Sequence, residues 1–359
     1  YVPSKNLPAL SHVASVPSNG ASSETPRGGP AGPKRISWRS SSPNYPRACS
    51  PPWAARPSFP FPSSAAGTPG VWAKLESFNP GGSAKDRTAR ALVADALERG
   101  VLGPGSVVVE SSSGNLGVAL AREAAVGGWE FHCVVDPRTN QATLSMIAAL
   151  GAVLHPVTEP DPETGDWLTA RRNLVAELKE TLGAVNLDQY SNRAAFDAHD
   201  QGTMREIVQQ LGHAPELLAV AVSTTGTVGG CLRHVRNHGY DTKVVAVDAE
   251  GSVLFDGARG ERILPGYGAG VVTDLSQEVH PDRVVRVPAA DAVHAARAMA
   301  RTTGFVPGAS GGAVASAVAQ LIEQGVADEV VAVFHDDGRA YLDTVYNDSW
   351  VEEHIGGAE

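Results

Sequence analysis

The 359-residue sequence has few cysteines, no long apolar run and no excess of basic residues. Its three cysteines, Cys49, Cys133 and Cys231, form no CxxC pair and no His/Cys cluster at metal-ligand spacing, which argues against a disulfide scaffold and a metal site. No stretch approaches the roughly 18 apolar residues that a membrane helix requires. The first residues also lack the basic and then apolar pattern of an export signal. We therefore expect a cytoplasmic protein with no membrane span.

Charge excludes a further class of partner. Lysine and arginine number 29 and the acidic residues 39, so the formal net charge is −10. Proteins that bind nucleic acids neutralise phosphates with a basic surface, and this chain as a whole has no such excess. No nucleic-acid partner is expected.

Residues 1–70 differ in composition from the rest of the chain. They contain 14 of the 25 prolines, 14 serines, seven lysines or arginines and one acidic residue, Glu24. Such a segment cannot bury enough apolar surface to offset the entropy lost on ordering, so we interpret it as disordered. It is either a basic tail that recruits a partner or an aberrant extension from a misread coding frame, and the composition favours the second.

From residue 71 onward, short β-branched runs alternate with segments of helical periodicity. The strand-like runs are residues 106–110, 131–135, 218–222, 243–247 and 329–334. The helical segments are residues 88–99, 116–125, 168–182, 195–211, 290–301 and 313–324. This alternation predicts an α/β fold with open, mostly parallel, twisted sheets and helices on both faces, which places ligands beyond the carboxyl ends of strands. We expect an N-terminal lobe over residues 71–185, a C-terminal lobe over 186–350 and a tail over 351–359.

The first segment whose residues are suited to catalysis is residues 79–87, NPGGSAKDR, a turn that opens a helix. It places Lys85 near a helix N-terminus, where the partial positive charge disfavours an ammonium and favours a neutral amine. A neutral amine is what a Schiff base with an aldehyde cofactor requires. The alternative is an exposed lysine whose charge is compensated by Asp86, and this segment alone favours that alternative.

Two further segments follow strand-like runs and open helices, and both are suited to binding anions. Residues 111–117, SSSGNLG, offer backbone and hydroxyl donors for a carboxylate, although an ordinary serine-capped turn is as good an interpretation. Residues 223–230, STTGTVGG, can close around a phosphate. The absence of a Gly-Lys-Ser/Thr ending excludes a nucleoside-triphosphate loop and favours a phosphate that stays bound.

The fourth segment is residues 307–313, PGASGGA, in which Ser310 would make one hydrogen bond to a ligand or would cap the helix.

The four segments, in this order on strand-to-helix turns, resemble those of the fold type II pyridoxal-phosphate enzymes. This is the cysteine synthase and cystathionine β-synthase family, with a two-lobed fold like that of the tryptophan synthase β subunit. The resemblance extends from about Trp72 to Trp350 and includes KLESFNPGGS at 74–83 and HDDGRAYL at 335–342. It is strongest to the phosphoserine-dependent N-(2-amino-2-carboxyethyl)-L-glutamate synthases.

This resemblance implies pyridoxal 5'-phosphate as the cofactor, with Lys85 as the Schiff-base and catalytic residue. Asn115 would bond the ring oxygen of the cofactor, and Ser310 would face its pyridine nitrogen. Its phosphate would be held by Ser223, Thr224, Thr225, Gly226 and Thr227. The residues implied at the substrate are Ser112, Ser113, Gly114, Asn115, Tyr190 and Ser223. The resemblance also implies two anionic substrates, O-phospho-L-serine and L-glutamate, so Arg138 and Arg193 are further candidates for substrate binding.

The implied reaction is a β-replacement catalysed by a pyridoxal-phosphate-dependent transferase, a β-substituted alanine synthase. It joins O-phospho-L-serine and L-glutamate to give N-(2-amino-2-carboxyethyl)-L-glutamate and phosphate. A separate dehydrogenase would then release 2,3-diaminopropionate for siderophore or peptide-antibiotic biosynthesis. A homodimer is also implied. The segment at 335–337, HDD, resembles a metal trio, but we interpret it as a structural turn.

Three alternatives remain. The chain could be a cysteine synthase that uses O-acetylserine or O-phosphoserine with sulfide, although residues 223–227 differ from the Gly-Thr-Gly-Gly-Thr of those enzymes. It could be an inactive binding scaffold that keeps the fold, because the strand that the family places before the lysine segment is expected to be missing, with residues 67–70 as its remnant. Residues 266–270, GYGAG, suggest a dehydrogenase only weakly, because they lack the GxGxxG spacing.

Overall fold

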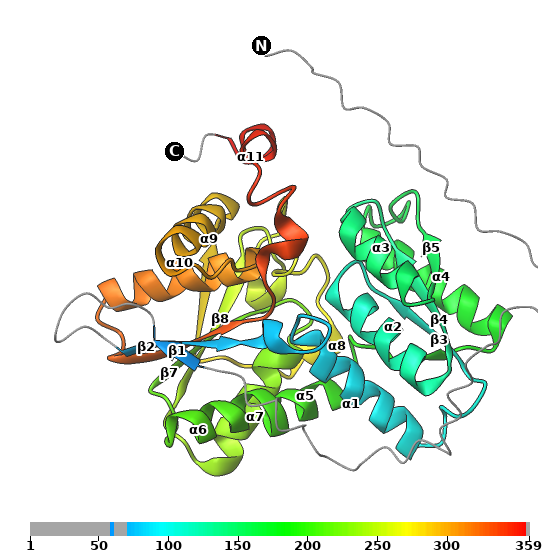
Figure 1. Ribbon diagram of the computed structural model, residues 1–359, viewed down its shortest axis with the longest axis horizontal. Coiled ribbons are helices and arrows are strands. Elements are labelled where there is room, and N and C mark those ends of the chain that lie inside the picture. The colour runs from blue at the N-terminus through cyan, green and yellow to red at the C-terminus, as the bar shows by residue number, and fades with distance from the viewer. Residues whose placement is uncertain (1–57, 61–69, 357–359) are drawn as a thin grey trace, which may run out of the picture. The chain divides into compact units, whose positions relative to one another are not determined.

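The computed structural model describes residues 58–60 and 70–356, and these residues form two sheets with helices on both faces of each (Figure 1). The interpretation of residues 1–70 as disordered therefore lies almost entirely outside the described residues. No helix within the described ranges is long and apolar enough to cross a membrane. The expected α/β class with mostly parallel sheets is confirmed.

The larger sheet has six strands, and all of its neighbouring pairs are parallel except β1 with β2. In spatial order these strands are β1 (Ser58–Pro60), β2 (Gly70–Leu75), β10 (Glu329–Phe334), β7 (Leu217–Ala221), β8 (Lys243–Ala249) and β9 (Arg283–Val287). The smaller sheet is entirely parallel, and its strands in spatial order are β5 (Val153–Pro156), β4 (Glu130–Val135), β3 (Val107–Ser111) and β6 (Val185–Asn186). The five runs of β-branched residues all form strands, as predicted.

The helices fill the connections between the strands. They are α1 (Lys85–Glu98), α2 (Asn115–Gly127), α3 (Gln141–Ala149), α4 (Trp167–Leu182), α5 (Ala194–Ala198), α6 (Arg205–Leu211), α7 (Gly226–His238), α8 (Asp274–Gln277), α9 (Ala289–Thr303), α10 (Ala309–Glu323) and α11 (Asp348–His354). A π-helical turn, η3 (His199–Met204), joins α5 to α6. The predicted helix over residues 195–211 is thus one run with a π-helical interruption, a feature that no periodicity announces.

The larger sheet is buried on both faces because its strands carry apolar residues at successive positions. On β7, Leu217 and Ala219 belong to the core beneath α9 and α10, whereas Leu218 and Val220 belong to the core with α7 on the other face. Figure 1 shows α9 and α10 above this sheet and α5, α6 and α7 below it. This double burial explains why the strands read as continuous apolar runs rather than as alternating patterns.

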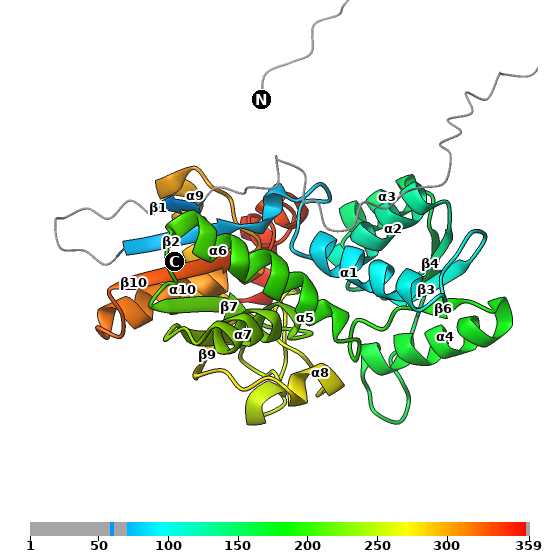
Figure 2. The same cartoon turned by 90° about the horizontal axis from the view of Figure 1, so that it is seen from below.

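The smaller sheet is covered in the same way. Val108 and Phe131 join the core that includes residues of α1, α2 and α3, whereas Val109 and Val134 pack with Val175 of α4 on the opposite face. Figure 2 shows α1, α2 and α3 on one side of these strands and α4 on the other.

The edge of the larger sheet differs from expectation. The strand that the family places before the lysine segment is expected to be missing, and this is wrong: β1 and β2 both precede Lys85 and pair antiparallel. A three-residue edge strand is defined by backbone pairing with its neighbour, and so short a segment carries no readable pattern. In turn, β2 pairs with β10 of the larger sheet although it precedes the smaller sheet in the sequence.

Candidate active site

A cavity of about 310 Å³ lies where the loops after β3, β7, β8 and β10 meet the loop before α1. Parallel strands place their carboxyl ends at one sheet edge, where open α/β sheets bind ligands. Every site residue in the predicted set lies on its lining: Lys85, Ser112, Ser113, Gly114, Asn115, Tyr190, Ser223, Thr224, Thr225, Gly226, Thr227 and Ser310. The fold therefore brings together segments that are far apart in the sequence.

Lys85 is the first residue of α1, and the loop that carries it is fixed to the end of β10. The N–H of Ala84 donates to the carbonyl of His335 at 2.8 Å. Next to this bond, Ser83 and Asp336 pair as an isolated antiparallel bridge. The lysine is thus positioned by a strand that enters the sheet some 250 residues later.

The ammonium group of Lys85 lies in a setting that favours its neutral form. Burial lowers the pKa of Lys85 to about 8, although the carboxylate of Glu110 acts in the opposite direction. Its Nζ donates to Thr224 Oγ1 at 3.2 Å. From the sequence, the neutral amine was attributed to the helix N-terminus, whereas in the structure burial is the main cause of the lowered pKa.

The loop before α2 uses one serine for its own architecture. Ser112 Oγ accepts hydrogen bonds from the N–H of Gly117 at 2.9 Å and from the N–H of Gly114 at 3.3 Å. This capping shapes the turn, and the first N–H groups of a helix have no intrahelical partner. Ser113 and Asn115 complete a polar lining suited to a carboxylate.

Asn115 is held in place by a buried carboxyl group. Its Nδ2 donates to Asp336 Oδ2 at 2.8 Å, and the hydroxyl of Tyr341 donates to the same oxygen at 2.8 Å. Burial raises the pKa of Asp336 to about 6. The Oδ1 atom packs against Gly308, where a Cβ atom would come within 2.0 Å of it, so only glycine fits at that position. Asp336 thus fixes the side-chain orientation of Asn115.

The loop between β7 and α7 has the backbone shape of an anion site. Thr225, the residue before α7, has a left-handed conformation with φ of 64°. Its hydroxyl donates to the carbonyl of Thr224 at 2.7 Å. The turn therefore leads directly into the N-terminus of the 13-residue helix α7, whose first N–H groups and dipole favour a phosphate.

Ser310 is the second residue of α10 and is buried at 1% exposure, yet it lies on the cavity lining. Its Cβ lies near Gly266 of the loop that follows β8. The side chain places a hydroxyl, rather than a carboxylate, at this wall of the cavity.

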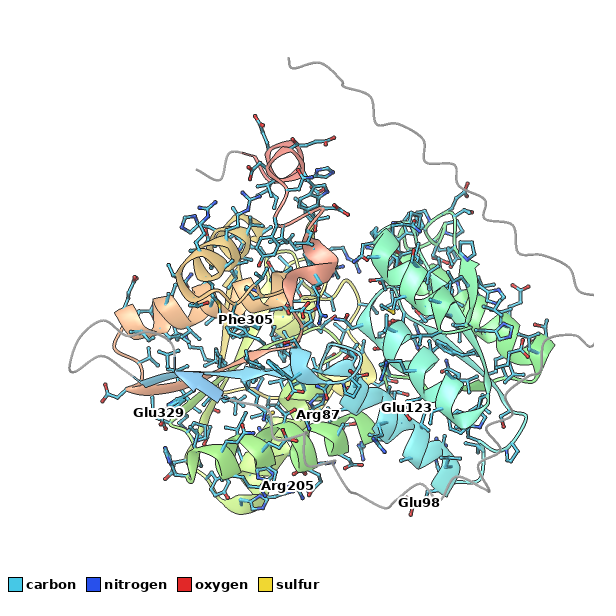
Figure 3. The ribbon with its side chains drawn as sticks, in the orientation of Figure 1. Arg87, Glu98, Glu123, Arg205, Phe305 and Glu329 are labelled. Atoms are coloured by element: carbon cyan, nitrogen blue, oxygen red, sulfur yellow. The ribbon has the colours of Figure 1, made fainter. Side chains whose placement is uncertain are left out.

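A buried ion-pair network lies next to the lysine loop. The guanidinium of Arg87 (Figure 3) donates to Glu76 at 2.7 Å and to both oxygens of Glu206 at 2.8 and 2.6 Å. The Nζ of Lys74 also donates to Glu206 at 2.8 Å. Lys74 and Glu76 are fully buried. These bonds join β2, α1 and α6, so the start of α1 cannot shift without breaking them.

His199 connects α1 to the first turn of α7. Its Nε2 lies 3.1 Å from Thr88 Oγ1 and 3.3 Å from Thr227 Oγ1, and its Nδ1 lies 2.9 Å from Thr203 Oγ1. Burial lowers the pKa of His199 to about 3, so the ring is neutral. A neutral imidazole has one donor and one acceptor, and it can hold hydroxyl groups at both ring nitrogens without adding charge to the cavity.

Sequence reasoning assigned no binding role to four charged residues of the lining, Asp166, Arg171, Arg262 and Asp336. Asp336 lies two residues after the end of β10, and this strand-end position was the available signal. Arg138 lies on the lining as the sequence suggested, whereas Arg193 does not and instead pairs with Glu278 at 3.0 Å on the exposed surface. No group of three or more His, Cys, Asp or Glu residues in the described part of the chain is arranged to hold a metal.

The donor set fits a cofactor that carries an aldehyde and a phosphate. The cavity contains one buried lysine of lowered pKa, one helix N-terminus approached by small hydroxyl residues, and one further polar loop. These groups match, respectively, an aldehyde, a phosphate and a substrate carboxylate.

Comparisons with known proteins point to the same cofactor. A family model described as pyridoxal-phosphate dependent enzyme matches residues 57–336. Proteins of Cupriavidus metallidurans and Ralstonia nicotianae, both named N-(2-amino-2-carboxyethyl)-L-glutamate synthase, are 38% identical over 285 and 282 residues, which cover 78% of this chain and 84% and 83% of theirs. The crystal structure of O-ureido-L-serine synthase is similar with a TM-score of 0.75 at 27% identity, covering 82% of this chain and 93% of that one.

Proposed function

Because this chain belongs to the pyridoxal-phosphate dependent enzymes, and pyridoxal phosphate is therefore its cofactor, we propose that it joins O-phospho-L-serine to L-glutamate. The bond between Cβ and the phosphate ester oxygen of phosphoserine breaks, and a bond forms between Cβ and the α-nitrogen of glutamate. The amine loses one proton, phosphate leaves, and no oxidant or reductant is needed. The product is N-(2-amino-2-carboxyethyl)-L-glutamate.

Residues of the cavity hold the cofactor in this proposal. Lys85 binds the aldehyde, and the backbone and hydroxyl groups from Ser223 through Thr224, Thr225 and Gly226 to Thr227 bind the phosphate. Asn115 bonds the ring oxygen, and Ser310 faces the pyridine nitrogen. When bound, the cofactor withdraws electrons from the Cα of the amino acid and so stabilises the negative charge that develops there.

The remaining roles belong to substrate handling. The loop from Ser112 through Ser113 and Gly114 to Asn115 binds the α-carboxylate of the donor. The amine of Lys85 would move the proton of Cα, first as a general base and then as a general acid. Tyr190 and Ser223 contact the substrate. Tyr190 is buried on the lining beside Ser111, whose carbonyl oxygen lies 3.5 Å from its hydroxyl.

One observation supports this proposal above the others: a single cavity contains a buried amine together with the helix N-termini of α2 and α7. Two anion sites on either side of one reactive amine suit a cofactor phosphate and an amino-acid carboxylate at the same time. The names of the two relatives then select the product.

The test is a product assay. The purified holoenzyme is incubated with phosphoserine and either glutamate or sulfide, and the products are identified by mass spectrometry. We expect a product that contains both carbon skeletons with glutamate and little cysteine with sulfide. Cysteine as the dominant product would contradict the proposal and favour a cysteine synthase.

We also propose that the enzyme acts as a cytoplasmic homodimer and that a separate dehydrogenase consumes its product to release 2,3-diaminopropionate for siderophore or peptide-antibiotic biosynthesis. The dimer and the pathway follow from the family resemblance. The cytoplasmic assignment is supported by Cys133 and Cys231, which are both buried free thiols.

A further inference from the structure

The cavity has an arginine side, which we define as Arg138, Arg171 and Arg262. Two of the three are compensated by one carboxylate. Arg138 lies 2.8 Å and Arg171 lies 3.1 Å from Asp136 Oδ2. Arg262 makes no hydrogen bond and no ion pair with any residue in the described ranges 58–60 and 70–356.

The backbone around Arg262 is well anchored. The N–H of Gly268 donates to the carbonyl of Val222, the residue before the phosphate-type loop, at 2.6 Å. The N–H of Ala269 donates to Ser252 Oγ at 3.0 Å, and Arg259 donates to the carbonyl of Gly270 at 2.7 Å. The absence of a partner for Arg262 is therefore a property of a fixed loop.

The guanidinium of Arg262 lies over Gly270. A Cβ atom at Gly270 would come within 2.6 Å of Arg262 Nη2 and within 3.0 Å of Asp166 Oδ1. Asp166 approaches from the start of α4 on the smaller sheet, where its other oxygen caps the helix by accepting from the N–H of Thr169 at 2.9 Å. The glycine leaves room for both side chains, yet they form no ion pair.

The electrostatic setting of Arg262 calls for an anion. Its side chain is half-buried, and burial together with the nearby charge of Arg138 lowers its pKa, although the charges of Asp166 and Asp248 act in the opposite direction. A partly desolvated cation beside other cations gains more from an anion than an exposed one does. Arg is also suited to carboxylate and phosphate groups, because its planar fork binds two oxygens at once.

The substrates supply such anions. In the proposed function, the N-terminus of α7 binds the cofactor phosphate and the loop before α2 binds the α-carboxylate of the donor. The side-chain phosphate of phosphoserine and both carboxylates of glutamate then have no assigned partner, and of these the phosphate and the γ-carboxylate lie at the end of a side chain.

We propose that Arg262 binds the anionic group at the end of a substrate side chain, either the phosphate of the donor or the γ-carboxylate of the acceptor. This inference rests on the proposed function and adds to it a residue that selects acidic substrates. Arg262 acts in binding, so it governs KM more than kcat.

The test compares holoenzyme variants. Arg262→Gln removes the charge at similar length. The matched control is Arg301→Gln, which removes the same charge from an exposed side chain in the last turn of α9, outside the cavity lining. Asp166→Asn is a second control, because asparagine still caps α4 while the charge that faces Arg262 disappears.

Two pairs of substrates separate the two sources of the anion. If the γ-carboxylate is bound, Arg262→Gln raises the KM of glutamate about ten- to hundredfold and abolishes the preference for glutamate over glutamine. If the phosphate is bound, the KM of phosphoserine rises by the same factor while that of O-acetylserine is unchanged. In both cases kcat changes by less than about threefold, and Arg301→Gln has KM values near those of the wild type.

A binding measurement keeps this test separate from the proposed function. Glutarate and inorganic phosphate are titrated into wild-type and variant holoenzymes by calorimetry, and neither needs turnover. Wild-type enzyme that makes no product would refute the proposed function alone. Unchanged affinities and KM values in Arg262→Gln would overturn the role of Arg262. Equal losses in Arg262→Gln and Asp166→Asn that are not additive would also overturn it, because Arg262 would then act through Asp166.

Discussion

The lysine side of the cavity, Lys85 with residues 223–227, and the arginine side are built in opposite ways. On the lysine side, Arg87 and His199 tie the surrounding elements together through buried bonds. On the arginine side, Arg138 and Arg171 share the carboxylate of Asp136, and Arg262 has no partner within the described residues. A rigid, satisfied frame suits chemistry that stays the same for every substrate. Unsatisfied charge suits selection among substrates.

The largest expected effect is the loss of activity when the reactive amine of the lysine side is removed. Lys85→Ala should lower product formation by about 10³-fold or more, because general acid–base catalysis alone contributes 10²- to 10⁴-fold and the aldehyde also loses its anchor. Borohydride reduction followed by peptide mass spectrometry should find no pyridoxyl group on the mutated peptide. Lys243→Ala, an exposed lysine that lies 3.4 Å from Asp282, is the control and should remain fully labelled. Labelling of another lysine with retained activity would remove Lys85 from its role.

The next effect concerns the frame itself. Glu206→Gln leaves Lys74 and Arg87 buried without one of their counter-charges, and breaking a buried pair from one side costs about 3 kcal/mol of unfolding free energy. Although burial acts in the opposite direction, the hydrogen bonds from Arg87 lower the pKa of Glu206. The contribution of Glu206 to the free energy of unfolding is thus fully present above the pKa of glutamate in the unfolded chain and is lost as the pH falls. Urea unfolding at pH 7 and pH 4 measures both effects.

A matched control is Glu353→Gln, on the exposed last turn of α11. It should leave the urea midpoint unchanged. If Glu206→Gln proves equally harmless at pH 7, the network does not stabilise the lysine side, and the contrast between the two sides loses its basis.

The pH dependence of cofactor loading sharpens the same contrast. Because burial lowers the pKa of Lys85 to about 8, the neutral amine of the apoprotein should increase about tenfold per pH unit below 8 and level off above it. Stopped-flow absorbance after mixing apoprotein with pyridoxal phosphate measures this rate. The unfolded chain binds more protons between pH 8 and 10.5, so the apoprotein should also gain stability across that window. A rate that keeps rising to pH 10.5 would mean that Lys85 is not desolvated.

The two sides also differ in how well the sequence predicts their binding residues. The lysine side consists of short segments of small residues at strand ends, and such segments carry a local signal for anion binding in their serines, threonines and glycines. The arginine side does not, because an arginine in a loop looks the same whether it faces a cavity or the solvent. Arg193 and Arg262 were indistinguishable in this sense, and only the fold separates them.

The same reasoning applies to the fold. Continuous β-branched runs predicted the five central strands because both faces of these strands are buried. The edge strand β1 and the π-helical turn η3 left no such pattern. Asp336 illustrates the limit within the site, since its partner Asn115 lies 221 residues away and the contact exists only after both sheets have formed. Local patterns predict elements and turns, whereas pairings across the chain depend on topology.

The smallest expected effect lies within the arginine side. Arg138 is half exposed, already pairs with Asp136 at 2.8 Å and lies over the ring of Trp167 at 5.8 Å. An exposed ion pair of this kind contributes only about 0–1 kcal/mol. Arg138→Gln should therefore raise the KM of either substrate by less than about fivefold. Arg262→Gln should exceed this effect for one substrate, since the unpaired cation gains a bond on substrate binding whereas the paired one exchanges partners. Steady-state kinetics of both variants, with each substrate varied in turn, measures the ratio. An effect of Arg138→Gln equal to that of Arg262→Gln would show that total charge, rather than the lack of a partner, determines selectivity on the arginine side.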